Sequence, residues 1–194
     1  MIKSFFWSKK WFQWAYGGAI FLIVLIYAKV SLAVKLNTWY GEFYDLLQKA
    51  NERPVAEFWS GLMLFMYIAI PWIFLDTITW YFTRIYSLRW REAITCDYIP
   101  RWKKVAEEIE GASQRIQEDT YKFAKIVESI GSQVLDAIMT LIAFIPILWF
   151  LSKGVEIKYL KDISGSLVWL ALLVSSGGMI ISWFVGAKLP GLEY

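Results

Sequence analysis

The sequence lacks histidine altogether and has a single cysteine, Cys96, among its 194 residues. The absence of histidine removes the commonest transition-metal ligand and the usual general base. One cysteine excludes a disulfide within the chain. The sequence also has no G-x-x-x-x-G-K-[ST] phosphate-binding loop, so we expect that this chain hydrolyses no nucleotide by itself. These absences predict a protein that is not an enzyme and that holds no metal or cofactor.

Apolar and aromatic residues are in excess instead. They make up 58% and 19% of the chain, and the mean hydropathy is +0.44. Four apolar runs come close to the ~20 residues that a helix needs to cross a hydrocarbon core of ~30 Å. They cover residues 14–34, 58–83, 134–151 and 166–187. We therefore predict an all-α membrane protein, with residues 1–194 forming a single transmembrane domain of four spans.

The net charge of +3 is too small to suggest nucleic acid as a partner, but its distribution predicts an orientation. The segment 84–133, between spans two and three, contains nine Lys and Arg residues. The segments on the opposite side, 35–57 and 152–165, contain three each. Basic residues favour the cytoplasmic side of a membrane. We therefore expect a multi-pass protein of the bacterial inner membrane, in contact with lipid, with both termini in the cytoplasm.

Two polar segments separate the first three spans. The segment 84–133 is rich in helix-forming residues, and its apolar positions recur at helical spacing. We predict that span two continues into the cytoplasm, that the chain reverses between Pro100 and Gly111, and that a helix from about Ser113 leads into span three. The segment 35–56 is amphipathic and aromatic, so it either lies along the outer membrane boundary or extends span one.

Ionisable residues inside an apolar run are costly, at about 2.5–3.5 kcal/mol or more each, and normally face a cavity or a partner. Lys29 is predicted to lie about a turn and a half from the outer end of span one, where its side chain extends to the interface. Asp76, in span two, has a structural hydrogen bond or a role in a transport pathway.

A polar line enters span three. Glu128, Ser132, Asp136 and Thr140 follow one another at intervals of four residues, so they share one helical face. Such a line suits either a water-filled cavity or a helix contact made by a few polar side chains. Burial favours the neutral form of a carboxylic acid, so a glutamate here can take up a proton from one side and release it to the other.

Several blocks of the sequence resemble, in the same order, the SbmA/BacA family of bacterial inner-membrane peptide transporters. They are "NTWYGEFYDLLQKA", "RWREAIT", "EGASQRIQEDTYKFA", "DAIMTLIAFIPIL" and "GAKLPGLEY". The resemblance implies a homodimer built like the transmembrane domain of an ABC exporter. It also implies import of antimicrobial peptides and microcins, driven by the proton gradient.

The resemblance assigns roles to individual residues. It implies a proton relay through Glu118 and Glu128, and we add Asp136, which stands where Asn is expected. Arg115 is expected to pair with a carboxylate. The cytoplasmic family motif maps onto Glu110, Gly111, Ala112, Gln114, Arg115, Gln117, Glu118, Asp119 and Thr120. The motif at the outer end maps onto Trp39, Tyr40, Phe43, Tyr44 and Asp45.

The family continues for about two further spans beyond "KLPGLEY", and an exporter-like half needs six helices. We therefore expect a complementing C-terminal polypeptide or a second copy as partner, with a peptide as substrate. Two alternative functions stay open. The chain is a truncated or split fragment that acts only as an assembly partner, or it is the permease of an ATP-driven ABC transporter.

Overall fold

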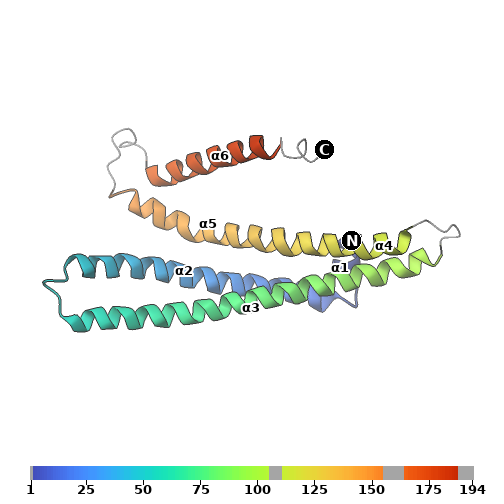
Figure 1. The fold of residues 1–194 in the computed structure, drawn as a ribbon, viewed down its shortest axis with the longest axis horizontal. Coiled ribbons are helices and arrows are strands. Elements are labelled where there is room, and N and C mark those ends of the chain that lie inside the picture. The colour runs from blue at the N-terminus through green and yellow to red at the C-terminus, as the bar shows by residue number, and fades with distance from the viewer. Residues whose placement is uncertain (1, 105–110, 155–163, 188–194) are drawn as a thin grey trace. The chain divides into compact units, whose positions relative to one another are not determined.

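The computed structural model describes residues 2–104, 111–154 and 164–187, and every regular element in these ranges is a helix (Figure 1). The chain divides into two compact units, Met1–Thr140 and Leu141–Tyr194, which are described separately. Four helical segments are long and apolar enough to cross a membrane: Gln13–Gln48, Val55–Trp102, Gln117–Leu151 and Ser166–Gly186. The protein is thus an all-α membrane protein with four candidate spans, as predicted.

A long antiparallel pair of helices forms most of the first unit (Figure 1). Helix α2 spans Gly18–Gln48 and follows a π-helical turn, η1, at Gln13–Gly17. Helix α3 spans Val55–Trp102; its 48 residues correspond to a length of about 72 Å, more than twice the hydrocarbon thickness. Of the two alternatives for residues 35–56, extension of span one is confirmed through Gln48. We call the end of the pair where the chain turns from α2 to α3 the hairpin end.

The polar segment after α3 returns along it as a helix. Helix α4 spans Ala112–Ile126, a second π-helical turn, η2, spans Val127–Gly131, and α5 spans Ser132–Leu151. Gly111 precedes α4 with φ 74°, a left-handed conformation that favours glycine. The predicted helix from about Ser113 into span three is therefore confirmed.

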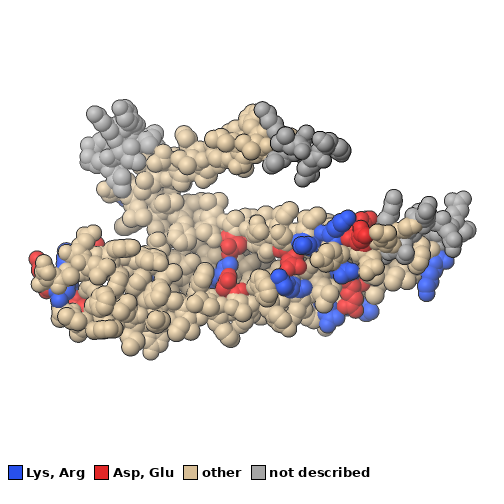
Figure 2. Space-filling view, viewed as in Figure 1, with Lys and Arg blue, Asp and Glu red and all other residues tan. Residues whose placement is uncertain are grey.

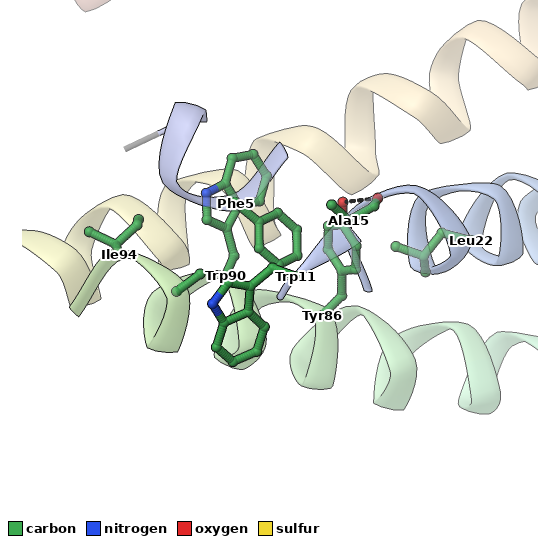
Figure 3. Packing of buried hydrophobic residues seen from close by; sticks show 8 residues of the cluster. Phe5, Trp11, Ala15, Leu22, Tyr86, Trp90 and Ile94 are labelled. Atoms are coloured by element: carbon green, nitrogen blue, oxygen red, sulfur yellow. Dashed lines mark hydrogen bonds between the residues drawn. The ribbon is translucent and has the colours of Figure 1, made fainter. Parts of the chain in front are cut away.

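The N-terminal residues pack against α3 through an aromatic cluster (Figure 3). Helix α1 spans Ile2–Phe6, and its Phe5 is fully buried. The Phe5 ring stacks on Trp90 at 5.2 Å and meets Tyr86 edge-on at 5.4 Å. The Phe123 ring of α4 meets Trp90 edge-on at 5.7 Å. Three segments far apart in sequence are thereby joined around one side of α3.

Tyr86 also fixes the start of α2. Its hydroxyl donates a hydrogen bond of 3.0 Å to the carbonyl of Ala15 in η1 (Figure 3). Its ring lies so close to Gly18 that a Cβ atom there would come within 2.7 Å of it. The absence of a side chain at Gly18 therefore allows α2 and α3 to approach each other closely at this point.

The second unit contains the end of α5 and helix α6, Ser166–Gly186. Gly165 precedes α6 with φ 76°, and the ring of Trp149 occupies the space that a Cβ atom would need. The Ser152 hydroxyl oxygen accepts a hydrogen bond of 3.1 Å from the backbone N–H of Leu167. These contacts determine how the chain enters α6.

Two adjacent glycines test the close approach of α2 and α3. Gly17 and Gly18 have the same helical backbone conformation, but a Cβ atom at Gly17 would meet nothing within 4 Å. Gly18→Ala should lower the free energy of unfolding by about 1–3 kcal/mol, because the added methyl group displaces the Tyr86 ring. Gly17→Ala should be neutral or stabilising by up to about 1 kcal/mol. Unfolding in detergent micelles, followed by circular dichroism, measures both. Equal effects of the two substitutions would contradict the packing described.

Candidate functional site

Three charged side chains from three helices meet inside the apolar part of the first unit. Lys29 of α2 lies between Asp76 of α3 and Asp136 of α5. Its Nζ atom is 3.4 Å from Oδ1 of Asp76 and 3.0 Å from Oδ1 of Asp136. The Lys29 side chain is 17% exposed, against 51% for Asp76 and 42% for Asp136. We call this group the charge triad.

The residues of the triad lie within apolar stretches of sequence. Figure 2 shows a group of acidic and basic atoms near the middle of the first unit, with a broad uncharged surface between this group and the hairpin end. In sequence, Lys29 is the only charged residue of segment 11–34, and Asp76 is the only one of segment 58–83. The two charges therefore have each other as the partners that an apolar environment requires.

The structure corrects the interpretation of Lys29. The residue was expected near the outer end of span one, with its ammonium group reaching the membrane interface. Because α2 continues to Gln48, Lys29 lies about 28 Å before the end of the helix. Its ammonium group contacts two carboxylates instead of extending to the interface. Asp76 was expected to have either a structural hydrogen bond or a role in a transport pathway, and the structure shows a 3.4 Å hydrogen bond to it from Lys29.

A second ion pair lies about two turns away, between Arg84 of α3 and Glu128 of η2. The Arg84 guanidinium is 3.6 Å from Oε1 of Glu128 and lies over the Trp80 ring at 3.8 Å. A guanidinium over an indole face gains cation–π attraction. The Trp80 ring thus helps to hold Arg84 beside Glu128.

The triad and Glu128 line one polar cavity of about 360 Å³. Its lining residues are Ile26, Lys29, Asp76, Thr79, Trp80, Thr83, Glu128, Ser129, Ser132, Gln133 and Asp136. The predicted polar line of span three therefore faces a cavity through three of its four members, and Thr140 is not among the lining residues. The π-helical turn η2 changes the helical register between Glu128 and Ser132, yet both still face the cavity.

Glu128 also borders two further cavities. One, of about 200 Å³, is mostly apolar and includes Leu22, Tyr86 and Trp90 in its lining. The other, of about 330 Å³, is lined by Arg84, Arg91 and Lys125 among others. Glu128 thus lines three cavities: the polar cavity, a mostly apolar cavity and a basic cavity.

Glu118 lies away from this cavity. Its carboxylate is exposed, accepts a 2.8 Å hydrogen bond from Gln114 and pairs with Lys122 at 3.5 Å. Ten residues separate it from Glu128, about 15 Å along the helix. The structure therefore brings together two of the three predicted relay residues, Glu128 and Asp136, and leaves Glu118 apart.

The remaining residues of the cytoplasmic motif lie on α4. Thr120 is buried, its hydroxyl donating to the carbonyl of Gln117 at 3.3 Å, while Asp119 is exposed. Glu110 and the side chains of Ala112 and Arg115 lie outside the described residues, so the expected Arg115 ion pair stays a prediction.

The other motif lies at the hairpin end of α2. The Trp39 indole N–H donates a 2.8 Å hydrogen bond to the carbonyl of Gly61 in α3. The Trp39 ring stacks on Phe43 at 4.7 Å, and Tyr40 stacks on Tyr44 at 6.3 Å. Asp45 is exposed. These aromatic residues join α2 to the start of α3.

Two features of the site were missed from the sequence. The Arg84–Glu128 pair carries no spacing signal, because its members are 44 positions apart on different helices. The triad did have a signal: one cation and two carboxylates lie in separate apolar runs, and such charges tend to pair.

The chain matches the SbmA/BacA-like family over residues 8–194. It is similar to an uncharacterized ABC transporter ATP-binding protein of Haemophilus influenzae, with 24% identity over 97% of this chain and 35% of the relative. An inner membrane ABC transporter ATP-binding protein of Escherichia coli K12 is 23% identical over 97% of this chain and 36% of the relative. The chain thus spans about a third of the length of these relatives.

A comparison of one lysine variant with one arginine variant tests whether the triad stabilises the fold. Lys29→Met leaves two carboxylates facing each other without their cation, so we expect it to lower the free energy of unfolding by more than about 1 kcal/mol. The control is Arg53→Met, which breaks the exposed Arg53–Glu57 pair and should cost about 0–1 kcal/mol. Thermal unfolding in detergent at neutral pH measures both. A cost for Lys29→Met no larger than that of the control would show that the triad adds no stability.

Proposed function

This chain belongs to the SbmA/BacA-like family, and we propose that it forms part of an inner-membrane transporter that imports peptides using the proton gradient. The observation that carries the proposal is the polar cavity. It places Glu128 and Asp136 on one face of a helix that enters the membrane, together with Lys29 and Asp76 from the two neighbouring helices. Carboxylates in such a place can exchange protons with water while lying within the span.

Glu128 is proposed as the point where protons enter or leave the cavity. It borders both the polar cavity and the basic cavity around Arg91 and Lys125. The Arg84 guanidinium pairs with its carboxylate at 3.6 Å. Protonation of Glu128 would release Arg84, which changes the charge at the boundary between the two cavities. Asp136, two turns further along the helix, is the next proposed carrier.

Glu118 has a weaker place in this proposal. Its carboxylate is exposed and paired with Lys122, so it is proposed only as a proton acceptor at the start of the route. Transfer from Glu118 to Glu128 has to pass through water, because the two lie about 15 Å apart along the helix.

Substrate and assembly follow the family resemblance. We propose antimicrobial-peptide-like substrates, both termini in the cytoplasm, and assembly with a second copy or with a polypeptide that supplies further spans. This chain is proposed to catalyse no covalent reaction. The fragment alternative, a chain that acts only as an assembly partner, would give no uptake by the chain alone and co-purification with another helical membrane protein.

A second candidate function rests on the names of the relatives. Both proteins described above are named as ATP-binding proteins of ABC transporters, and this chain corresponds to about a third of each. The chain would then be the membrane part of an ATP-driven transporter. Vesicles with a pH gradient and no ATP, and vesicles with ATP and no pH gradient, separate the two functions.

Replacement of Glu128 tests the relay. Glu128→Gln should reduce uptake of a fluorescent proline-rich peptide into vesicles under an imposed pH gradient by at least about tenfold, because the amide binds no proton at these pH values. The control is Glu57→Gln at the hairpin end, where the carboxylate pairs only with the exposed Arg53 in the described structure. Wild-type uptake by the Glu128→Gln variant, at equal protein level, would exclude this glutamate from the relay.

A further inference from the structure

We propose that Lys29, Asp76 and Asp136 form a single proton-binding site in which the two aspartates share one proton and Lys29 is the positioning residue. The inference rests on the proposed proton-driven transport and adds a lysine and an aspartate that had no assigned role in it. It follows from the contacts of the triad and from the charge that these three groups carry together.

The triad has an excess of one negative charge. One ammonium group faces two carboxylates, and these three groups come from α2, α3 and α5. The one further charged residue of the lining is Glu128 of η2, and its charge is balanced from outside the lining by Arg84 of α3, with which it pairs. Other residues of the lining, such as Thr79, Thr83 and Ser132, are uncharged. The cavity thus lacks one positive charge.

Binding of one proton supplies the missing positive charge. It also greatly lowers the free-energy cost of removing water from the triad. A site with a net charge must keep water around it, whereas a neutral site can be enclosed by apolar surfaces at a much lower cost. Transfer of a proton from water to one aspartate forms an O–H bond and makes the triad neutral. Release of the proton to water on the other side restores the charge. The protonation state thereby determines whether the cavity can close.

Both aspartates contact the same ammonium group. The Nζ atom of Lys29 is 3.0 Å from Oδ1 of Asp136 and donates a 3.4 Å hydrogen bond to Oδ1 of Asp76. Oδ1 of Asp136 is buried and has no hydrogen-bond partner in the described structure. The two carboxylates are thus coupled through one cation, and a single proton shared between them neutralises the site. Lys29 touches both carboxylates and ensures that one proton, not two, neutralises the site.

A series of charge variants tests the proposal, with uptake measured as a function of pH. Lys29→Met leaves two negative charges, so the pH at which uptake is half-maximal should rise by about 1–3 units. Lys29→Arg keeps the cation and should leave this pH within about half a unit of wild type. Asp76→Asn leaves a neutral Lys29–Asp136 pair without any proton, so uptake should fall at least about tenfold and lose its pH dependence.

The decisive member of the series is Lys29→Met combined with Asp76→Asn. In this double variant Asp136 is the only ionisable group left of the three. The net charge of the site therefore changes between minus one and zero on proton binding, as in the wild-type triad. It should therefore recover pH-dependent uptake that each single variant has lost or shifted. A structural role for Lys29 predicts the opposite, that the double variant is at least as impaired as Lys29→Met. That outcome would overturn the proposal, and so would a wild-type pH profile in Lys29→Met.

Proton binding in detergent separates this inference from the proposed function. Infrared difference spectra of the purified protein between high and low pH should show a carboxylic-acid C=O band that is absent in both Asp76→Asn and Asp136→Asn. In Lys29→Met the same band should persist to a higher pH. If the wild-type protein shows this band but no uptake driven by a pH gradient, proton-driven transport fails and the binding site stands. If uptake is proton-driven and the band is unchanged in both Asn variants, the proposed function stands and the triad is not the site.

Discussion

The cost of placing a charge among apolar residues constrains the first unit more than any other interaction. A lysine in the middle of α2 is tolerated because two aspartates meet it, and those aspartates belong to α3 and α5. The pairing therefore relates three helices to one another at one level of the spans. Thr79, Thr83 and Ser132 give the surrounding cavity its polar character. The arrangement that satisfies a physical requirement also produces the feature on which the proposed transport depends.

Aromatic packing joins α3 to its neighbours on either side of the triad. At the hairpin end, Trp39 contacts Phe43 and donates a hydrogen bond to the Gly61 carbonyl. At the other end, Trp90 of α3 contacts Phe5 and Phe123 from two distant segments. The charged centre therefore lies between an aromatic region that holds α2 against α3 and one that holds α1 and α4 against α3. A membrane protein that uses lipid as its second apolar solvent can place its large side chains in this way without one central core.

The helices could be predicted from the sequence because hydropathy, length and helix propensity act locally. The helix through Ser113 and the four spans follow from such local signals. The positions of partners from distant segments could not be obtained in this way. Lys29 was expected to reach the interface because its apolar run ends near residue 34, whereas in the folded chain its ammonium group contacts two carboxylates of other helices. The polar line through Glu128 and Asp136 predicted a cavity, but only the folded chain adds Lys29 and Asp76 to its lining and pairs Glu128 with Arg84.

The two π-helical turns have a mechanical consequence. Gln13–Gly17 and Val127–Gly131 each contain a wider turn than the α-helices that follow them. A wide turn of this kind can move along a helix by exchanging one set of backbone hydrogen bonds for another, and each such step rotates the residues that it passes. Glu128 lies within η2, and Asp136 lies in α5, about two turns after Glu128. The carboxylates of Glu128 and Asp136 can therefore rotate relative to each other about the helix axis without unfolding of the helix.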